Sequence, residues 1–256
     1  MSRPFFLDTP RGRLFAVDHG PEAGARGAAV LAPPFLEEAK HAERALHALA
    51  EALAAAGIRT LRLDYRGTGD SEGAGIDFSP RASLDDIRAG REWLRRAAGV
   101  EPGLVGCRFG GLAAGLASEG APWLVLWQPS VAGRSEVEGA ARRAQVRRAL
   151  TAGRAGAGPV EGPIDLDGVR ISADAVREFA TLDLVAASAM LPSRVLVVQA
   201  AARPEPASAL RPLLSALGAR GRFEGVVQEP FWEAWGSAKG FEEGVRRTVE
   251  WIRSCL

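Results

Sequence analysis

Three glycine- or proline-bearing segments carry the residue types that acyl-transfer sites use. Pro33 and Pro34 end one apolar run, residues 63–71 (LDYRGTGDS) follow a second, and residues 104–111 (LVGCRFGG) span the end of a third. The glycines at 106 and 110 have the spacing of a G-x-S-x-G turn, which presents a nucleophile between a strand and a helix. The order of the segments predicts one site assembled at an edge of a sheet.

The nucleophile position of this turn is held by Arg108. A guanidinium stays protonated and cannot attack a carbonyl carbon. A general-base histidine should follow the strand near 226–227, but the histidines of the chain are His19, His41 and His47. Glu205 is the nearest candidate for the acid. A serine–histidine–acid mechanism is therefore excluded at these positions.

Arg108 would point into a pocket at the amino end of a helix, where a cation is unfavourable by up to about 1 kcal/mol unless an anion compensates it. Glu37 and Glu38, on the neighbouring loop, could form an ion pair with it. A carboxylate or phosphate of a ligand could instead bind the guanidinium and the helix amides. The two interpretations are compatible, because an internal pair can open for a ligand.

Four further residues fall where a pocket would be built, and we expect Phe35, Phe109, Gln128 and Trp232 to contact a ligand. Gln128 and Trp232 could equally be core residues. Cys107 stands one position before the tip of the turn, so its side chain should point into the core. We expect it to pack there as a small apolar residue and not to act as a nucleophile.

Composition excludes several classes of protein. The 256 residues include 32 basic and 31 acidic ones, with arginines scattered among acids, so no nucleic-acid partner is expected. Two cysteines exclude a disulfide scaffold, and His41 and His47 are six residues apart, too far round a helix for a metal pair. No metal and no cofactor are expected. No apolar run approaches about 18 residues and no signal pattern opens the chain, which predicts a cytoplasmic protein without a membrane span.

The pattern of apolar runs predicts an α/β fold with a mostly parallel sheet covered by helices on both faces. An antiparallel hairpin opens the chain, and continuous apolar strands then alternate with helices at helical spacing. Ser83 is the expected N-cap of the second helix. The expected strands are 5–7, 14–17, 28–32, 60–64, 104–106, 123–127, 195–198 and 225–227, and the expected helices are 39–56, 83–97, 110–118, 207–217 and 241–253.

Residues 130–192 interrupt this alternation. They contain an arginine-rich helix at 135–150, a glycine/alanine stretch at 153–158 that we expect to be flexible, a hairpin at 164–171 and a short helix at 173–179. We expect residues 1–129 and 193–256 to form the core and 130–192 to be a small cap. The cap should lie over the carboxyl ends of the strands, where open α/β sheets bind ligands.

The chain resembles the α/β-hydrolase superfamily, and within it the exosortase A system-associated hydrolases of the second type, from bacterial exopolysaccharide and protein-sorting gene clusters. The match covers most of the chain and is weakest in the insertion. In that family arginine is usual at the position of Arg108, whereas Cys107 and the second proline before Phe35 depart from its pattern. The resemblance rests on residues 34–38 (PFLEE) leading into Lys40 and Arg44, and on 106–110, 126–129 (LWQP) and 230–232 (PFW).

Two functions are compatible with these residues. One is a hydrolase of non-standard mechanism on an acyl or anionic small molecule, with Glu37 or Glu38 activating water and Arg108 stabilising the oxyanion. Such a carboxylate needs a raised pKa, which burial favours and Arg108 opposes. The alternative is a catalytically inactive relative that binds an anionic or acyl ligand, or a partner protein of the exopolysaccharide cluster. Fold alone does not decide between them.

Overall fold

The computed structural model describes residues 2–151, 164–166, 169–232 and 241–256, with backbone only for 143–151 and 164–166. Eight strands form one sheet in the order β1-β2-β4-β3-β5-β6-β9-β10, in which β1, β2 and β4 pair antiparallel and all other neighbours pair parallel. The opening hairpin and the mostly parallel sheet are thus confirmed. The strands are β1 Ser2–Thr9, β2 Gly12–His19, β3 Gly27–Ala32, β4 Ile58–Leu63, β5 Gly103–Cys107, β6 Leu124–Trp127, β9 Val195–Ala201 and β10 Gly221–Val227.

Each predicted helix is present, with boundaries that differ by up to four residues: α6 begins at Arg211 where position 207 was expected, and α2 begins three residues early. The second helix begins at Pro80, and its N-cap is Ser79, whose hydroxyl accepts a hydrogen bond from the amide of Ala82 at 3.0 Å. Ser83 lies inside the helix instead, because proline suits a first helical position, where no amide hydrogen is needed. The helices are α1 Glu37–Ala55, α2 Pro80–Ala98, α3 Phe109–Leu116, α4 Gly133–Thr151, α5 Ala173–Phe179, α6 Arg211–Leu217 and α7 Glu242–Arg253, with short 3-10 turns at Gly75–Asp77, Ser188–Met190, Ser208–Leu210 and Gly218–Arg220.

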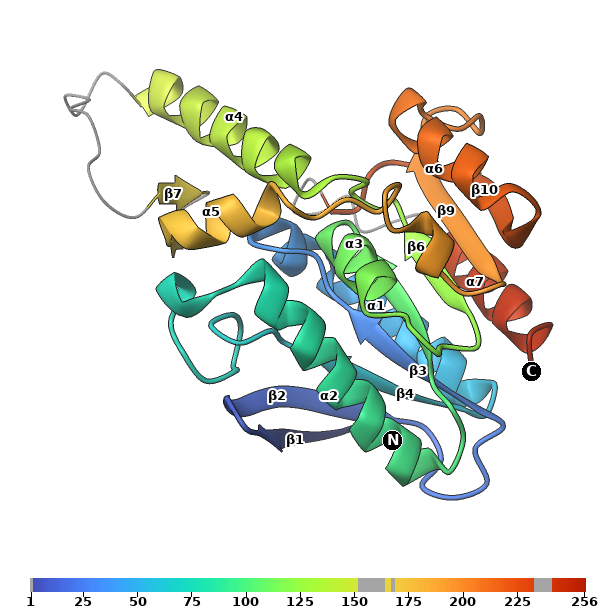
Figure 1. Ribbon diagram of the computed structural model, residues 1–256. Coiled ribbons are helices and arrows are strands. Elements are labelled where there is room, and N and C mark those ends of the chain that lie inside the picture. Colours follow the sequence, from blue (N-terminus) through green and yellow to red (C-terminus); the bar gives the residue numbers. More distant parts are fainter. Residues whose placement is uncertain (1, 152–163, 167–168, 233–240) are drawn as a thin grey trace.

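Helices cover both faces of the sheet (Figure 1). α2, α3 and α6 contribute buried side chains to one apolar cluster, and α1 and α7 contribute theirs to a second cluster on the opposite face. The central strands β3, β5 and β6 are buried at every position, so their side chains must be apolar or small in both directions. This is why these strands appear in the sequence as continuous apolar runs.

The segment between β6 and β9 crosses the end of the molecule at which the parallel strands finish (Figure 1). It holds α4, α5 and a hairpin of β7 Ile164–Leu166 with β8 Val169–Ile171. The glycine/alanine stretch at 153–158 and the turn at 167–168 lie outside the described residues. The hairpin touches the core through Val169, which reaches the 3-10 turn at Gly75.

No helix among the described residues combines the length and the apolar character needed to cross a membrane.

Candidate ligand site at the strand-to-helix elbow

The turn between β5 and α3 has the backbone shape of a nucleophile elbow. Arg108 stands at its tip with φ 55° and ψ −120°, a left-handed conformation that non-glycine residues rarely adopt. A Cβ at Gly106 would lie 2.1 Å from the carbonyl oxygen of Gly110, and one at Gly110 would lie 2.1 Å from that of Ala32. Both glycines are therefore required by the close approach of β5, α3 and the end of β3.

The side chain of Arg108 is held by a carboxylate, a carbonyl and an aromatic ring. Its Nε lies 3.1 Å from Glu38 Oε2, and its NH2 lies 3.3 Å from Glu38 Oε1. A third nitrogen donates to the carbonyl oxygen of Gln128 at 3.2 Å, and the guanidinium carbon lies 5.5 Å from the ring centroid of Trp232. Burial alone would lower the pKa of Arg108, but the charges of Glu38 and Glu136 and the hydrogen bonding to Glu38 together outweigh it, and the pKa is raised. The elbow tip thus carries a fixed cation whose charge is compensated internally.

Only one of the two candidate glutamates reaches Arg108. Glu38 is buried in the first turn of α1 and forms the pair, whereas Glu37 turns outward and its Oε1 accepts from Lys40 Nζ at 2.8 Å. Consecutive residues of an α-helix point about 100° apart, so the helix cannot bring both side chains to one guanidinium. The ion pair that the sequence predicted is present, and it is made through Glu38.

Phe109, which the sequence predicted as a ligand contact, lies in the core and outside the lining of the cavity that Phe35 borders. It is fully buried and packs between Phe35, Tyr65, Phe78 and Phe179, with ring centroids 5.3–6.0 Å away. The physical reason is that the residue after the elbow already belongs to α3 and faces the sheet. Phe35, in contrast, stacks on Phe78 at 4.1 Å and presents part of its surface to a cavity.

The carbonyl oxygen of Gln128 and the ring of Trp232 both contact the guanidinium of Arg108. Gln128 has a positive φ of 42°, and its side-chain Oε1 accepts a hydrogen bond from the amide of Ala200 at 3.2 Å, so it ties β6 to β9. Trp232 is buried and packs against Phe231, whose ring is 4.9 Å away. Both therefore act as supports of the elbow.

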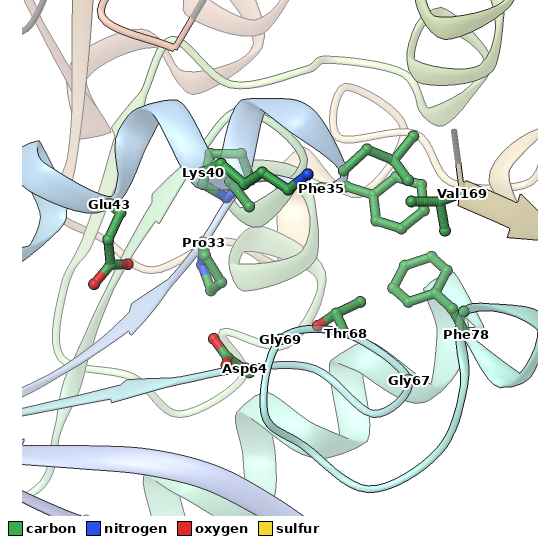
Figure 2. Close-up of a pocket in the computed structure, with 14 residues that line it drawn as sticks. Pro33, Phe35, Lys40, Glu43, Asp64, Gly67, Thr68, Gly69, Phe78 and Val169 are labelled. Atoms are coloured by element: carbon green, nitrogen blue, oxygen red, sulfur yellow. The ribbon is translucent and has the colours of Figure 1, made fainter. Parts of the chain in front are cut away.

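A cavity of about 600 Å³ lies beside the elbow, between α1 and the loop that follows β4 (Figure 2). The hydroxyl of Tyr65 donates to the carbonyl oxygen of Pro33 at 3.0 Å and joins the two loops that form its walls. Figure 2 shows an apolar end, where Phe35, Phe78 and Val169 gather, and an acidic end near Glu43 and Asp64. The lining is Pro33, Pro34, Phe35, Leu36, Ala39, Lys40, Glu43, Asp64, Gly67, Thr68, Gly69, Gly75, Phe78 and Val169.

Asp64 is the polar residue of this cavity that sequence reasoning missed. Burial raises the pKa of its carboxyl group, and the neighbouring charge of Glu43 raises it further. One carboxylate oxygen accepts a hydrogen bond from the amide of Asp70 at 3.0 Å. The signal was available in the sequence, because Asp64 directly follows a strand in the segment 63–71, at the edge where ligand sites form.

The other candidate groups do not add a nucleophile. Cys107 is fully buried, and burial raises the pKa of its thiol, so it remains protonated and unreactive as expected. Glu205, the candidate acid after β9, is exposed, and only its backbone carbonyl accepts from Gln199 at 2.9 Å. Conventional triad chemistry has neither its serine nor a histidine after position 47.

Comparisons with known proteins identify the fold of the chain. No protein-family model and no curated protein matches the chain. Among solved structures, the chain is similar to Est1E from Butyrivibrio proteoclasticus with ferulic acid bound (20% identity, 98% of each chain, TM-score 0.71). It is also similar to α/β hydrolase GrgF from Penicillium sp. sh18 (16% identity, 100% and 99%, TM-score 0.71). XC6422 from Xanthomonas campestris, described as an α/β serine hydrolase without lid, matches at 19% identity (100% and 95%, TM-score 0.60). The chain therefore has the α/β-hydrolase fold.

Proposed function

We propose that this α/β-hydrolase-fold protein is catalytically inactive and binds a small acylated molecule in the cavity beside Phe35. The observation that carries the proposal is the ion pair of Arg108 with Glu38 at the elbow tip. The position that holds the nucleophile in serine hydrolases is filled by a cation, and that cation is compensated from within the protein.

The alternative, water activation by a glutamate, is disfavoured by the same pair. Both carboxylate oxygens of Glu38 accept hydrogen bonds from Arg108, so the carboxylate is held by the cation. Glu37 is engaged with Lys40, a residue of the cavity lining. A hydrolase using these residues would have to open the pair before each turnover.

The cavity supports an acyl ligand. Its volume of about 600 Å³ suits a small molecule, and most of its wall is apolar. At the apolar end an acyl chain would contact Phe35, Phe78 and Val169. At the other end, Asp64 and Glu43 present carboxylate oxygens that accept hydrogen bonds, while the lining cation Lys40 is already paired with Glu37. This end therefore disfavours a further negative charge. The ligand that fits best carries hydroxyl or amide donors on its polar end, and a free carboxylate fits poorly.

The resemblance to exosortase A system-associated proteins suggests the cellular process in which this ligand binding would take place. Proteins of such clusters handle exopolysaccharides and sorted proteins. An acylated sugar or lipid precursor would fit the cavity, with its acyl chain at the apolar end and its hydroxyl or amide donors at the polar end. A partner protein of the same cluster is the second occupant that the resemblance suggests. Residues 130–192 would then serve as the cap, with β8 contributing Val169 to the cavity wall.

Calorimetric titration with matched ligands tests the proposal. An N-acyl ethanolamide and the free fatty acid of the same chain length share the acyl body and differ in the polar end. We expect the amide to bind more tightly, and the variant Ala39→Phe to lose binding because the ring fills the cavity. Ala48→Phe is the matched control, since Ala48 is another half-buried alanine of α1 that lies outside this cavity.

The same preparations should be assayed for turnover on acyl esters and thioesters, together with Arg108→Ala and Glu38→Gln. Turnover by the wild type that either variant abolishes would replace the proposal with a hydrolase of non-standard mechanism. Equal binding by Ala39→Phe and Ala48→Phe would remove the cavity as the ligand site. A preference for the free fatty acid would contradict the assigned polar end.

A further inference from the structure

Two histidines and a glutamate meet on the far end of α1 from the elbow. His19 ends β2, whereas His47 and Glu51 lie one turn apart on α1. One nitrogen or oxygen of each lies within 4.8 Å of those of the other two, and the ring centroids of the histidines are 5.7 Å apart. His19 is fully buried, while His47 and Glu51 are exposed, so the cluster is anchored in the protein and open to solvent.

The geometry of His19 directs one ring nitrogen to the cluster. Its Nδ1 lies 2.7 Å from Glu51 Oε1, and its Nε2 accepts a hydrogen bond from Arg62 Nε at 3.3 Å. The Nδ1 atom therefore faces the carboxylate and the open side of the cluster. An imidazole nitrogen and a carboxylate oxygen are both ligands of divalent transition-metal ions.

We propose that His19, His47 and Glu51 form a binding site for a divalent transition-metal ion, with Zn²⁺ the preferred occupant. Two imidazoles and one carboxylate are a zinc donor set that leaves a fourth tetrahedral position for water. Histidine ligation favours zinc and its neighbours over magnesium or calcium, which prefer oxygen ligands. The donors need to close around the ion at about 2.0–2.2 Å, which exposed side chains on one helix turn can do by rotation.

Arg62 is the group that opposes the metal. When the ion binds Nδ1 of His19, the imidazole proton moves to Nε2. Nε2 can then no longer accept the hydrogen bond from Arg62 Nε, so the Arg62 side chain must move away. Arg62 already pairs with Glu43 through a second nitrogen, so it has an alternative partner on the surface of α1. Its positive charge still repels the ion. Removal of that charge should therefore tighten metal binding at this site, an effect that non-specific surface binding would not show.

The metal would join the opening hairpin to α1. Glu51 is thirteen residues from Glu38, which places the site about 20 Å along the helix from the elbow pair. The site is therefore separate from the elbow pair, and it meets the acidic end of the cavity through Arg62, which pairs with Glu43. Zinc and the acyl ligand are titrated separately, so either proposal can fail alone. An ion that bridges β2 and α1 would stabilise the fold, by an amount that grows with the logarithm of the ion concentration once this exceeds the Kd.

Zinc titration of the untagged protein tests the site, with Co²⁺ absorption reporting the coordination geometry. We expect one Zn²⁺ per chain and a rise in Tm. His47→Ala and Glu51→Gln, both on the surface, should weaken binding at least about tenfold. His41→Ala is the matched control on the same helix and should bind as the wild type does. Arg62→Gln should bind more tightly, by roughly tenfold, because it removes a repelling charge.

Two results would overturn the proposal. One is Zn²⁺ binding with a Kd above roughly 100 μM, which is the affinity expected of non-specific surface binding. The other is equal loss in His41→Ala and His47→Ala, or no loss in Glu51→Gln, either of which places the ion elsewhere.

Discussion

Replacement of Glu38 by glutamine tests the electrostatics of the elbow directly. The amide keeps the shape of the side chain and one acceptor, but it removes the larger of the two carboxylate charges that act on Arg108, and only that of Glu136 remains. Leaving one member of a buried pair alone costs about 3–5 kcal/mol. The loss here should be about 2–3 kcal/mol, because the Arg108 side chain is 24% exposed and still has the Gln128 carbonyl and the Trp232 ring. For 256 residues this is a fall in Tm of about 5 °C.

The matched control is Glu37→Gln, one residue away on the same turn. Its partner Lys40 is exposed, and an exposed pair contributes about 0–1 kcal/mol. Urea unfolding of both variants gives the comparison. The double variant Arg108→Met with Glu38→Gln should recover most of the loss, since it removes both members of the ion pair. Equal stability of the two glutamine variants, or a double variant that loses the sum of both single changes, would refute the reasoning.

Three further predictions address chemistry, packing and pH. Arg108→Ser should show no ester turnover above a blank, because the restored hydroxyl has no histidine after His47 to activate it. Gly110→Ala should unfold the protein or cost more than about 3 kcal/mol in calorimetry, since its Cβ would meet a carbonyl oxygen at 2.1 Å, whereas Gly244→Ala, with nothing within 4 Å, should be tolerated. Asp64→Asn should stabilise the protein at pH 7 in urea titrations. The raised pKa of Asp64 means that the folded state binds its proton more tightly than the unfolded state does. Its penalty therefore grows as pH rises from the unfolded value of 3.8 to the raised pKa, is constant above that, and disappears at a pH well below 3.8, where both states are protonated.

The fold was predictable because its central strands are buried on both faces. β3, β5 and β6 admit only apolar or small side chains, so the sequence shows them as unbroken runs. The start of a helix was less predictable where two residues could each serve as its N-cap. Ser79 and Ser83 are both suitable N-caps, and Pro80 decides between them. The elbow was located by Gly106 and Gly110, whose lack of side chains is a local steric requirement.

Side-chain partners across elements could not be predicted in the same way. The choice of Glu38 over Glu37 depends on the phase of α1, and hence on its first residue. The cavity around Asp64 depends on how far the loop after β4 stands from α1. The His19 cluster was missed because the spacing of His41 and His47 was compared along one helix. The partner of His47 on that helix is Glu51, and the third member comes from β2.

The backbone of the elbow has a consequence for how such turns are interpreted in other proteins. Strained residues often mark active sites, and the strain is then taken as part of the mechanism. Here the same φ of 55° is held by an arginine that can attack nothing. The close approach of β5, α3 and β3 imposes the conformation whatever residue occupies it. A left-handed elbow residue therefore reports the packing of this fold, and activity has to be judged from the side chain and its partners.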